Sequence, residues 1–336
     1  MSITITTGGI TMTGGGVSFT APPPAQATYG WYGAGYSAAT APIGGANYYS
    51  GVQRIDYSSD LTTASTRGPL SIALYLGAAT GNATDGWFGG GRVPGNPYSS
   101  SVSRMTYATD TATGSTRGPL SAGRYSLGAT GTSTAGWFAA GTIGYGITLI
   151  DRITYATDTA TASVRGSLLT SSPSTITGKQ GVVGITDKTT YGWFAGGGPA
   201  DSTTVNRITY ATDTANAPMR GPLINGCYNG GSSCTSDYGW FAFNDTGAGS
   251  TLVQRITYAT DTALSSIRGP LSYQASYGGG NGNNDYGWFG GGYTPGILFS
   301  QVSRITYATD TATASTRGSL ATYLGFTSGT QNTFYS

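Results

Sequence analysis

Two arginines, a tyrosine and an aspartate recur together along this chain. Of its residues, these are the best suited to anion binding or proton transfer. In one copy they are Arg104, Tyr107, Asp110 and Arg117. Paired guanidinium groups can bind an anion, and a carboxylate can transfer a proton. The same residues can instead form an ion-paired framework inside the fold. Because a binding site normally uses repeated units unequally, the recurrence of the whole group favours the framework.

The rest of the chain offers little catalytic chemistry. There is no histidine, and all 14 acidic residues are aspartates, so the usual proton-transfer residues and the commonest nitrogen ligand for metals are missing. A copper site of the galactose-oxidase type would need histidine. A sialidase site would need a carboxylate beside its arginines and tyrosine, but no glutamate and no Ser-x-Asp-x-Gly-x-Thr-Trp signature is found. We therefore predict no enzyme, no catalytic residue, no metal and no cofactor.

The arginine-tyrosine segment repeats six times, with a period near 50 residues. Its first arginine stands at Arg54, Arg104, Arg152, Arg207, Arg255 and Arg304. An aromatic pair keeps the same spacing and accounts for every tryptophan, at Trp31, Trp87, Trp137, Trp193, Trp240 and Trp288. A fixed period of this length predicts an array of similar structural units.

Each unit contains four segments with strand character. In the second unit these are residues 86–91, 102–108, 111–117 and 121–129, with a tight turn at Thr109 and Asp110 between the two middle ones. Four short antiparallel strands every 50 residues predict one blade of a β-propeller. A β-solenoid is the alternative, but its period would be about 20–30 residues. The fold class is therefore all-β.

The order of residues within a unit resembles the kelch repeat. The shared features are the glycine-ended aromatic strand at Trp87, a following Tyr107, and a later basic residue in Arg117-Gly118-Pro119-Leu120. The resemblance covers residues 28–336 and implies a kelch-like propeller with four-stranded blades. The chain departs from the kelch pattern in its outermost strand, which lacks the tryptophan found there.

The two ends of the chain indicate the number of blades. Residues 323–329 align with residues 75–81, which form an innermost strand, and no further tryptophan follows them. The first unit, conversely, has Trp31 but only proline-rich sequence where its innermost strand belongs. We predict that the C-terminal strand completes the first blade and closes a six-bladed ring, which protects the exposed edges.

The chain is accordingly divided into an N-terminal segment and a propeller. Residues 1–26 alternate isoleucine and threonine and end in a triple proline, so we interpret them as an extended arm and spacer. A strand folded back onto the main body is the alternative. Residues 27–336 form the propeller.

The repeated residues are assigned structural roles. Trp87 and Tyr107 should pack between neighbouring blades. Arg104 and Arg117 should be diagonal neighbours on one face of the sheet, where like charges need compensating oxygens. We expect carbonyl groups and loop aspartates such as Asp110 to supply them. An aromatic platform for sugars and an anion-binding ring of arginines remain the functional alternatives.

Variation between the units points to a recognition surface. The loop after each tryptophan strand differs, and in a propeller all these loops emerge on one face. A rigid ring with one diversified face is a common way to carry recognition. We select the tyrosines of these loops as ligand contacts, namely Tyr36, Tyr49, Tyr98, Tyr145 and Tyr293. The alternative is that these loops vary because little constrains them.

The composition suggests a structural or binding protein. Only 9% of residues are charged, against about 25% in ordinary domains, and the net charge is +2 without a separate basic patch, so no nucleic-acid partner is expected. The start of the chain lacks the pattern of a signal peptide, and no apolar stretch is long enough to span a membrane. Two cysteines, Cys227 and Cys234, are too few for a disulfide scaffold, and their spacing alone does not decide whether they pair.

This composition, rich in glycine, threonine, serine and tyrosine, is similar to that of tail-fibre and decoration proteins of tailed phages, especially marine ones. The resemblance implies a virion protein, assembled in the host cytoplasm and present in many symmetric copies. Residues 1–26 would join it to other virion proteins, and the loops would bind a host-surface glycan or protein. A cellular kelch-like scaffold and a carbohydrate-binding lectin are the alternatives.

Overall fold

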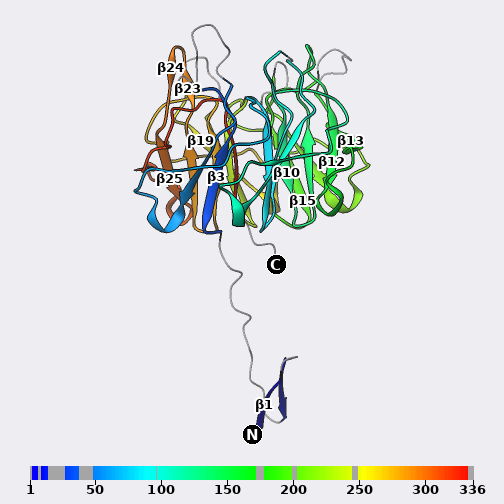
Figure 1. Cartoon of the computed structure of the whole chain (residues 1–336), viewed down its shortest axis with the longest axis vertical. Coiled ribbons are helices and arrows are strands. Elements are labelled where there is room, and N and C mark those ends of the chain that lie inside the picture. Colours follow the sequence, from blue (N-terminus) through cyan, green and yellow to red (C-terminus); the bar gives the residue numbers. More distant parts are fainter. Residues whose placement is uncertain are drawn as a thin grey trace.

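The computed structural model describes residues 27–37, 48–95, 97–171, 178–198, 203–243 and 249–331, together with the strands of residues 2–6 and 9–13. Strands joined by turns and short 3-10 helices make up this part, which contains no α-helix and hence none long and apolar enough to cross a membrane. Six antiparallel sheets stand side by side in a ring (Figure 1). The chain is a six-bladed β-propeller, as its repeat predicts.

The blades are numbered along the chain and described from the innermost strand outward. They consist of β27 (Ser328–Gln331), β3 (Tyr29–Gly33), β4 (Val52–Asp56) and β5 (Ser65–Arg67) in blade 1; β6 (Ala78–Gly81), β7 (Asp85–Gly89), β8 (Val102–Thr106) and β9 (Ser115–Arg117) in blade 2; β10 (Gly128–Gly131), β11 (Ala135–Ala139), β12 (Leu149–Thr154) and β13 (Ser163–Ser167) in blade 3; β14 (Val183–Thr186), β15 (Tyr191–Ala195) and β16 (Val205–Thr209) in blade 4; β17 (Gly231–Cys234), β18 (Tyr238–Ala242), β19 (Val253–Thr257) and β20 (Ser266–Arg268) in blade 5; and β21 (Gly279–Gly282), β22 (Tyr286–Gly290), β25 (Val302–Thr306) and β26 (Ser315–Arg317) in blade 6.

Three features depart from this plan. In blade 4 the outermost strand is reduced to an isolated bridge between Asn206 and Met219, where Pro218 has no N–H to donate. Blade 6 carries an extra hairpin of β23 (Tyr293–Thr294) and β24 (Ile297–Leu298). Near the N-terminus, β1 (Ser2–Thr6) and β2 (Gly9–Thr13) pair with each other as a separate two-stranded sheet. The rest of the predicted arm lies outside the described residues.

The strand boundaries correct the sequence prediction at two places. The tight turn expected at Thr109 and Asp110 is an eight-residue connection, because β8 ends at Thr106 and β9 begins at Ser115. A 3-10 helix opens this connection in every blade: η2 (Tyr57–Ser59), η3 (Tyr107–Thr109), η4 (Tyr155–Thr157), η5 (Tyr210–Thr212), η6 (Tyr258–Thr260) and η7 (Tyr307–Thr309). The innermost strand of blade 3 begins at Gly128 and not at residue 121, because residues 118–127 arch over from blade 2.

The C-terminal strand closes the ring, as predicted. Strand β27 pairs antiparallel with β3, so that Ser328 lies opposite Gly33 and Thr330 opposite Trp31. Blade 1 is therefore built from both ends of the propeller, and its sheet has the same order as the others. This pairing removes the open edge that a linear array of blades would have.

Each pair of neighbouring blades is joined by a cluster of four side chains, which we call the clamp. Its centre is the aspartate that follows the 3-10 helix. One oxygen of Asp110 in blade 2 accepts hydrogen bonds from the Trp31 indole and the Arg54 guanidinium of blade 1, and the Nε of Arg67 lies 3.4 Å from it. The Arg54 and Arg67 pair confirms the diagonal placement, since their equivalents Arg104 and Arg117 lie opposite Ser115 and Val102.

The clamp is present at all six interfaces with nearly the same geometry. The indole nitrogen lies 2.7–2.9 Å from the carboxylate oxygen, the first arginine 3.0–3.2 Å and the second 3.2–3.7 Å. The aspartates are Asp60, Asp110, Asp158, Asp213, Asp261 and Asp310. In the last interface Trp288, Arg304 and Arg317 of blade 6 bind Asp60 of blade 1, so the same contact closes the circle.

The tyrosine that opens each 3-10 helix extends this contact. Its ring stacks on the tryptophan of the preceding blade, with centroids 3.8–4.3 Å apart. For Tyr107 the partner is Trp31, and its hydroxyl is hydrogen-bonded to Thr330. Burial raises the pKa of Tyr107 and of its counterparts in the other blades. Stacking on a neighbouring blade explains why this residue leaves the strand.

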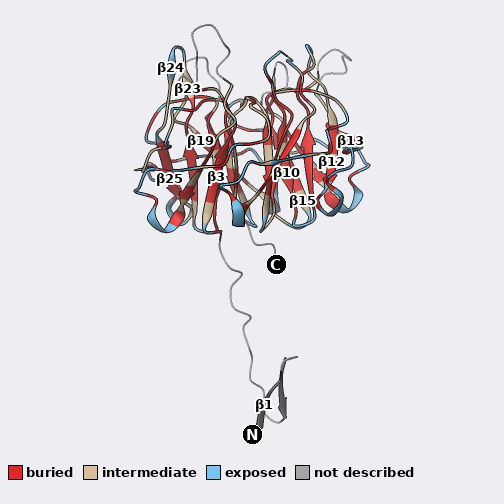
Figure 2. Cartoon of the chain, viewed as in Figure 1, coloured by how far each residue is buried: buried red, intermediate tan, exposed pale blue. Residues whose placement is uncertain are grey.

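The glycine after the second arginine is required by the same interface. The N–H of Gly118 donates to the backbone carbonyl of Asp158, and a Cβ at Gly118 would overlap the carbonyl of Ala160 in the next blade. Beside the clamps the interiors are apolar: six hydrophobic clusters are formed, one between each pair of blades. Figure 2 shows these buried residues on the strands and the exposed ones mainly on the turns.

We predict that the ring cannot fold without β27. Removal of residues 321–336 should abolish soluble folded protein, because β3 would lose its partner and blades 1 and 6 their contact. Circular dichroism and thermal melting would check this, with removal of residues 332–336 alone as the control that leaves β27 in place. A chain lacking residues 321–336 that melts like the full protein would contradict the closure.

We predict that Asp110→Asn lowers the free energy of unfolding by about 2–4 kcal/mol, since Arg54 and Arg67 would lose their shared counter-charge in a partly buried position. Urea unfolding followed by tryptophan fluorescence measures the change. Asp237→Asn is the control, because this aspartate lies on an exposed turn, and its effect should stay within about 0.5 kcal/mol. Equal effects of the two substitutions would show that the clamp is not a stabilising contact.

Candidate functional site

The propeller has two different faces. The loops after the second strand of each blade and the arches that lead to the next blade emerge on one side, which we call the loop face. The 3-10 helices and the short turns between first and second strands, such as residues 82–84, emerge on the opposite turn face. In Figure 1 the β23–β24 hairpin stands on the loop face. All five tyrosines selected from the sequence lie in segments of the loop face.

A series of five backbone hydrogen bonds runs around the central axis on the loop face. One residue per blade, just before the innermost strand, has a left-handed backbone with φ between 49° and 77°: Leu76, Ser126, Gly181, Asn229, Tyr277 and Phe326. The N–H of Phe326 donates to Tyr277, that of Leu76 to Phe326, Ser126 to Leu76, Gly181 to Ser126 and Asn229 to Gly181. These contacts hold the left-handed residues, which are costly for non-glycine side chains, at fixed places around the axis.

Aromatic rings gather beside this part of the ring. Phe326 contacts Tyr277, Tyr293, Tyr36 and Tyr75, with centroids 4.4–6.3 Å apart. Tyr75 in turn contacts Tyr36 and Tyr48 at 5.9 and 5.2 Å. Each of these residues is half-buried.

Arg92 extends the cluster towards blade 3. Its guanidinium lies 5.7 Å from the centre of the Tyr75 ring and 5.2 Å from that of Tyr125, within the range of a cation–π contact. Tyr125 stacks on Tyr98 at 6.0 Å. Burial raises the pKa of Tyr75, and the charge of Arg92 opposes this shift. We call the whole group the aromatic surface: Tyr36, Tyr48, Tyr75, Arg92, Tyr98, Tyr125, Tyr277, Tyr293 and Phe326.

The structure thus brings together three of the five selected tyrosines. Tyr36, Tyr98 and Tyr293 belong to the aromatic surface. Tyr49 instead packs on the hydrophobic cluster between blades 6 and 1, with its ring beside Gly51. Tyr145 is 56% exposed in the loop of blade 3 and makes no ring contact with the aromatic surface.

Most of the aromatic surface was missed by sequence reasoning. Tyr75, Tyr125 and Phe326 fall within the segments 75–81, 121–129 and 323–329, which the sequence predicts to be innermost strands, whereas the structure places them in the arches before these strands. The residue types at these positions could have indicated the aromatic surface. These arch positions carry aromatic rings in some units but not in others.

A buried ion pair supports the arch that carries Tyr125. Arg124 and Asp151 are both fully buried and lie 2.9 Å apart, and Arg124 also donates to the carbonyls of Ala122, Phe138 and Ala140. Burial lowers the pKa of the Arg124 guanidinium, while the Asp151 carboxylate acts in the opposite direction. Asp151 also accepts the N–H of Ser121, which anchors the start of the arch.

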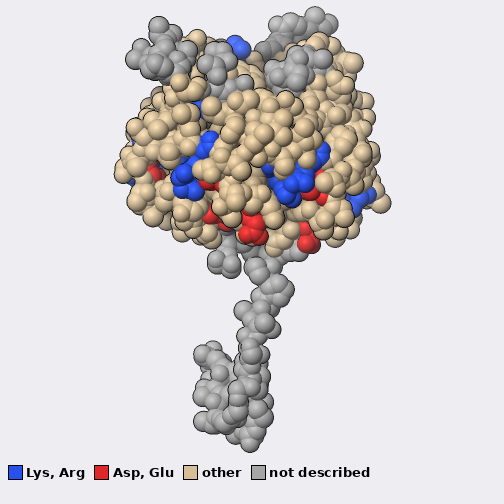
Figure 3. All heavy atoms as spheres, turned by 180° about the vertical axis from the view of Figure 1, so that it is seen from behind, with Lys and Arg blue, Asp and Glu red and all other residues tan. Residues whose placement is uncertain are grey.

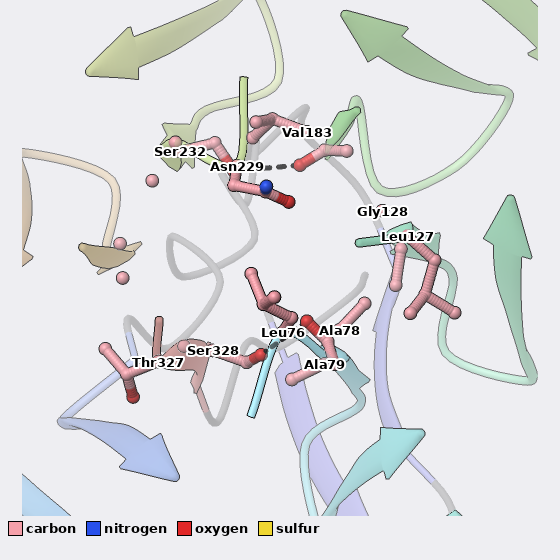
Figure 4. Close-up of a pocket in the computed structure, with 18 of the residues that line it drawn as sticks. Leu76, Ala78, Ala79, Leu127, Gly128, Val183, Asn229, Ser232, Thr327 and Ser328 are labelled. Atoms are coloured by element: carbon pink, nitrogen blue, oxygen red, sulfur yellow. Dashed lines mark hydrogen bonds between the residues drawn. The ribbon is translucent and has the colours of Figure 1, made fainter. Parts of the chain in front are cut away.

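The centre of the ring is closely packed. Two small cavities of about 80 and 90 Å³ lie along the axis between the innermost strands. Figure 4 shows the upper one, with Leu76, Leu127, Val183, Asn229 and Thr327 around it. Small-molecule pockets usually measure about 300–1,000 Å³. The axis therefore has room for a few water molecules only.

The charged groups are arranged for structure. Six of the 14 aspartates are held in the clamps, and the two cysteines are free and buried, with burial raising the pKa of Cys227 to about 12. No three acidic, cysteine or histidine side chains of the described ranges gather to hold a metal ion. In Figure 3, the basic and acidic atoms of the visible side mostly lie next to one another on the lower half of the ring, and uncharged residues cover most of the rest.

We predict that Arg124→Leu lowers the free energy of unfolding by about 3 kcal/mol, because it leaves the Asp151 carboxylate buried without its counter-charge. The double variant Arg124→Leu/Asp151→Ser should recover most of this loss. It recreates blade 2, where Leu74 occupies the equivalent place and Ser103 accepts the N–H of Ser71 at 3.0 Å. Urea denaturation of the four proteins in the cycle measures the coupling. A single variant as stable as the wild type would contradict it.

The comparisons with known proteins support the fold alone. No family model and no curated protein matches the chain. The solved structure of YjhT is similar, with a TM-score of 0.61 over 78% of this chain and 88% of that one, at 10% sequence identity. At this identity the likeness shows a shared propeller architecture.

Proposed function

We propose that the protein is a non-enzymatic virion protein of the tail-fibre, appendage or head-decoration type, whose loop face binds a host-surface or neighbouring virion component. The observation that carries this proposal is the aromatic surface. Tyrosine and arginine are enriched in binding interfaces because they combine large contact areas with hydrogen-bonding groups. Here they lie half-buried in a chain of which only 9% of the residues are charged.

The position of the two chain ends fits a display role. Tyr29, at the start of β3, pairs with Asp56 beside the 3-10 helix, and Gln331, at the end of β27, pairs with Gly30. The described propeller therefore begins and ends on the turn face. The described chain enters the propeller from that side, so an arm of residues 1–26 docked on a particle would leave the loop face directed outward.

The proposal includes a kelch-like repeat, and a carbohydrate-binding lectin and a cellular kelch-like scaffold are its alternatives. The kelch resemblance is supported by the glycine pair after β7, where Gly90 and Gly91 have φ of 70° and 94° and the chain turns closely past blade 3. Aromatic rings also suit the apolar faces of sugars, which makes a lectin the second candidate. A cellular kelch-like scaffold would use the same surface for a protein partner.

We predict that Tyr36→Ala/Tyr75→Ala weakens binding to host cells or to a matching glycan by at least about tenfold, since two adjacent rings would be lost from the surface. Cell-binding and glycan-array measurements with the full chain check this. Tyr323→Ala is the matched control, because this tyrosine is 60% exposed and lies outside the aromatic surface. Binding that survives the double change in a folded protein would place the ligand elsewhere.

The virion role has its own test. The full chain should co-sediment with phage particles in many copies, and a chain without residues 1–26 should lose this incorporation while keeping its binding to cells. A protein that never sediments with particles would favour the cellular scaffold. Normal incorporation without residues 1–26 would remove the docking role of the arm.

A further inference from the structure

One position on the turn face breaks the symmetry of the propeller. The first residue of the second strand is a tyrosine in blades 1, 4, 5 and 6: Tyr29, Tyr191, Tyr238 and Tyr286. Each ring lies under the first clamp arginine of its own blade, with the guanidinium carbon 4.2–4.4 Å from the ring centre. In blade 2 this place is taken by Asp85, which lies 3.7 Å from Arg104. Blade 3 has Ala135, which supplies neither a ring nor a charge.

The neighbours of Ala135 differ from their counterparts in the tyrosine-containing blades. The Arg152 side chain is 30% exposed, whereas its tyrosine-covered counterparts are 19–21% exposed. Thr154, which lies opposite Ala135, is exposed, while the threonines opposite Tyr191, Tyr238 and Tyr286 are half-buried. The plane of Trp137 is tilted 28° from that of Tyr210, against 7–15° in the other five stacks.

An open pocket of about 550 Å³ occupies this place between blades 3 and 4. Its lining includes Ala135, Trp137, Arg152, Thr154, Lys188 and Tyr210. In the four tyrosine-containing blades the equivalent tryptophan and arginine are in contact with the chain's own phenol ring. The pocket in blade 3 keeps these groups and lacks the ring.

We propose that this pocket binds a tyrosine side chain of a partner protein. The ring would take the position that Tyr191, Tyr238 and Tyr286 occupy in their own blades, with one face under Arg152 and an edge towards Trp137. We commit to a ring because a tyrosine takes this place beside an already paired arginine in four blades, whereas a carboxylate, Asp85, does so in one. Lys188 also lines the pocket, so an anion is the competing occupant that the experiment must separate. The pocket lies on the turn face, so the inference does not depend on the ligand of the loop face.

The experiment uses the full chain and N-acetyl-L-tyrosinamide as the probe. Protein-observed NMR follows the indole N–H of Trp137, which donates to Asp213 at 2.7 Å beneath the pocket. We expect a saturable shift of this signal with the wild type. Ala135→Tyr should abolish the shift or weaken binding at least about tenfold, because the chain's own ring would fill the pocket. N-acetyl-L-alaninamide is the ligand control.

The variant is also its own folding control. Four blades already carry tyrosine at this position, so Ala135→Tyr should melt at or above the temperature of the wild type. Absence of a saturable shift in the wild type would overturn the proposal, and so would equal binding by the wild type and Ala135→Tyr. Acetate tested in parallel distinguishes an anion site: saturation by acetate without saturation by the tyrosine probe would assign the pocket to a carboxylate and overturn the proposal.

Discussion

The propeller depends on one carboxylate oxygen at each blade interface. In every clamp this oxygen receives an indole N–H and lies within ion-pair distance of two guanidinium groups, all from the preceding blade. Burial of the aspartate would be unfavourable without these partners. Without the aspartate, the two arginines would repel each other. The arrangement therefore fixes the distance and the angle between adjacent sheets. It also accounts for 12 of the 14 arginines in a chain with few charges.

Each blade contacts the aspartate of the next blade in the same direction around the ring, so the last blade can make the same contact with the first. Blade 6 donates to Asp60 of blade 1 through the same three groups, and β27 adds the missing inner strand of that blade. Closure thus needs no special chemistry. The clamps lie towards the turn face, where the sequence repeats closely, and the loop face is left free to vary. This division explains how the aromatic surface is assembled from different residues in different blades.

The fold could be predicted from the sequence because its determinants are periodic. The spacing of Trp87 and Arg104 in each unit indicated blades, and the likeness of residues 323–329 to residues 75–81 indicated closure. The partner of Asp110 could not be predicted, because a repeat looks the same whether its aspartate binds within its own blade or its neighbour's. The 3-10 helix could not be predicted for the same reason, because Tyr107 leaves the strand to stack on Trp31 of the neighbouring blade.

The site was less predictable because it depends on which residues break the pattern. The variable loops predict Tyr36, Tyr98 and Tyr293, but Tyr49 packs on the hydrophobic cluster between blades 6 and 1, and Tyr145 is mostly exposed. In a symmetric scaffold, the packing of neighbouring blades explains a residue that is present in every blade. A position that departs from the other blades has no such explanation. Ala135 is informative for this reason: its blade keeps the tryptophan and the arginine, and leaves the ring between them to be supplied from outside.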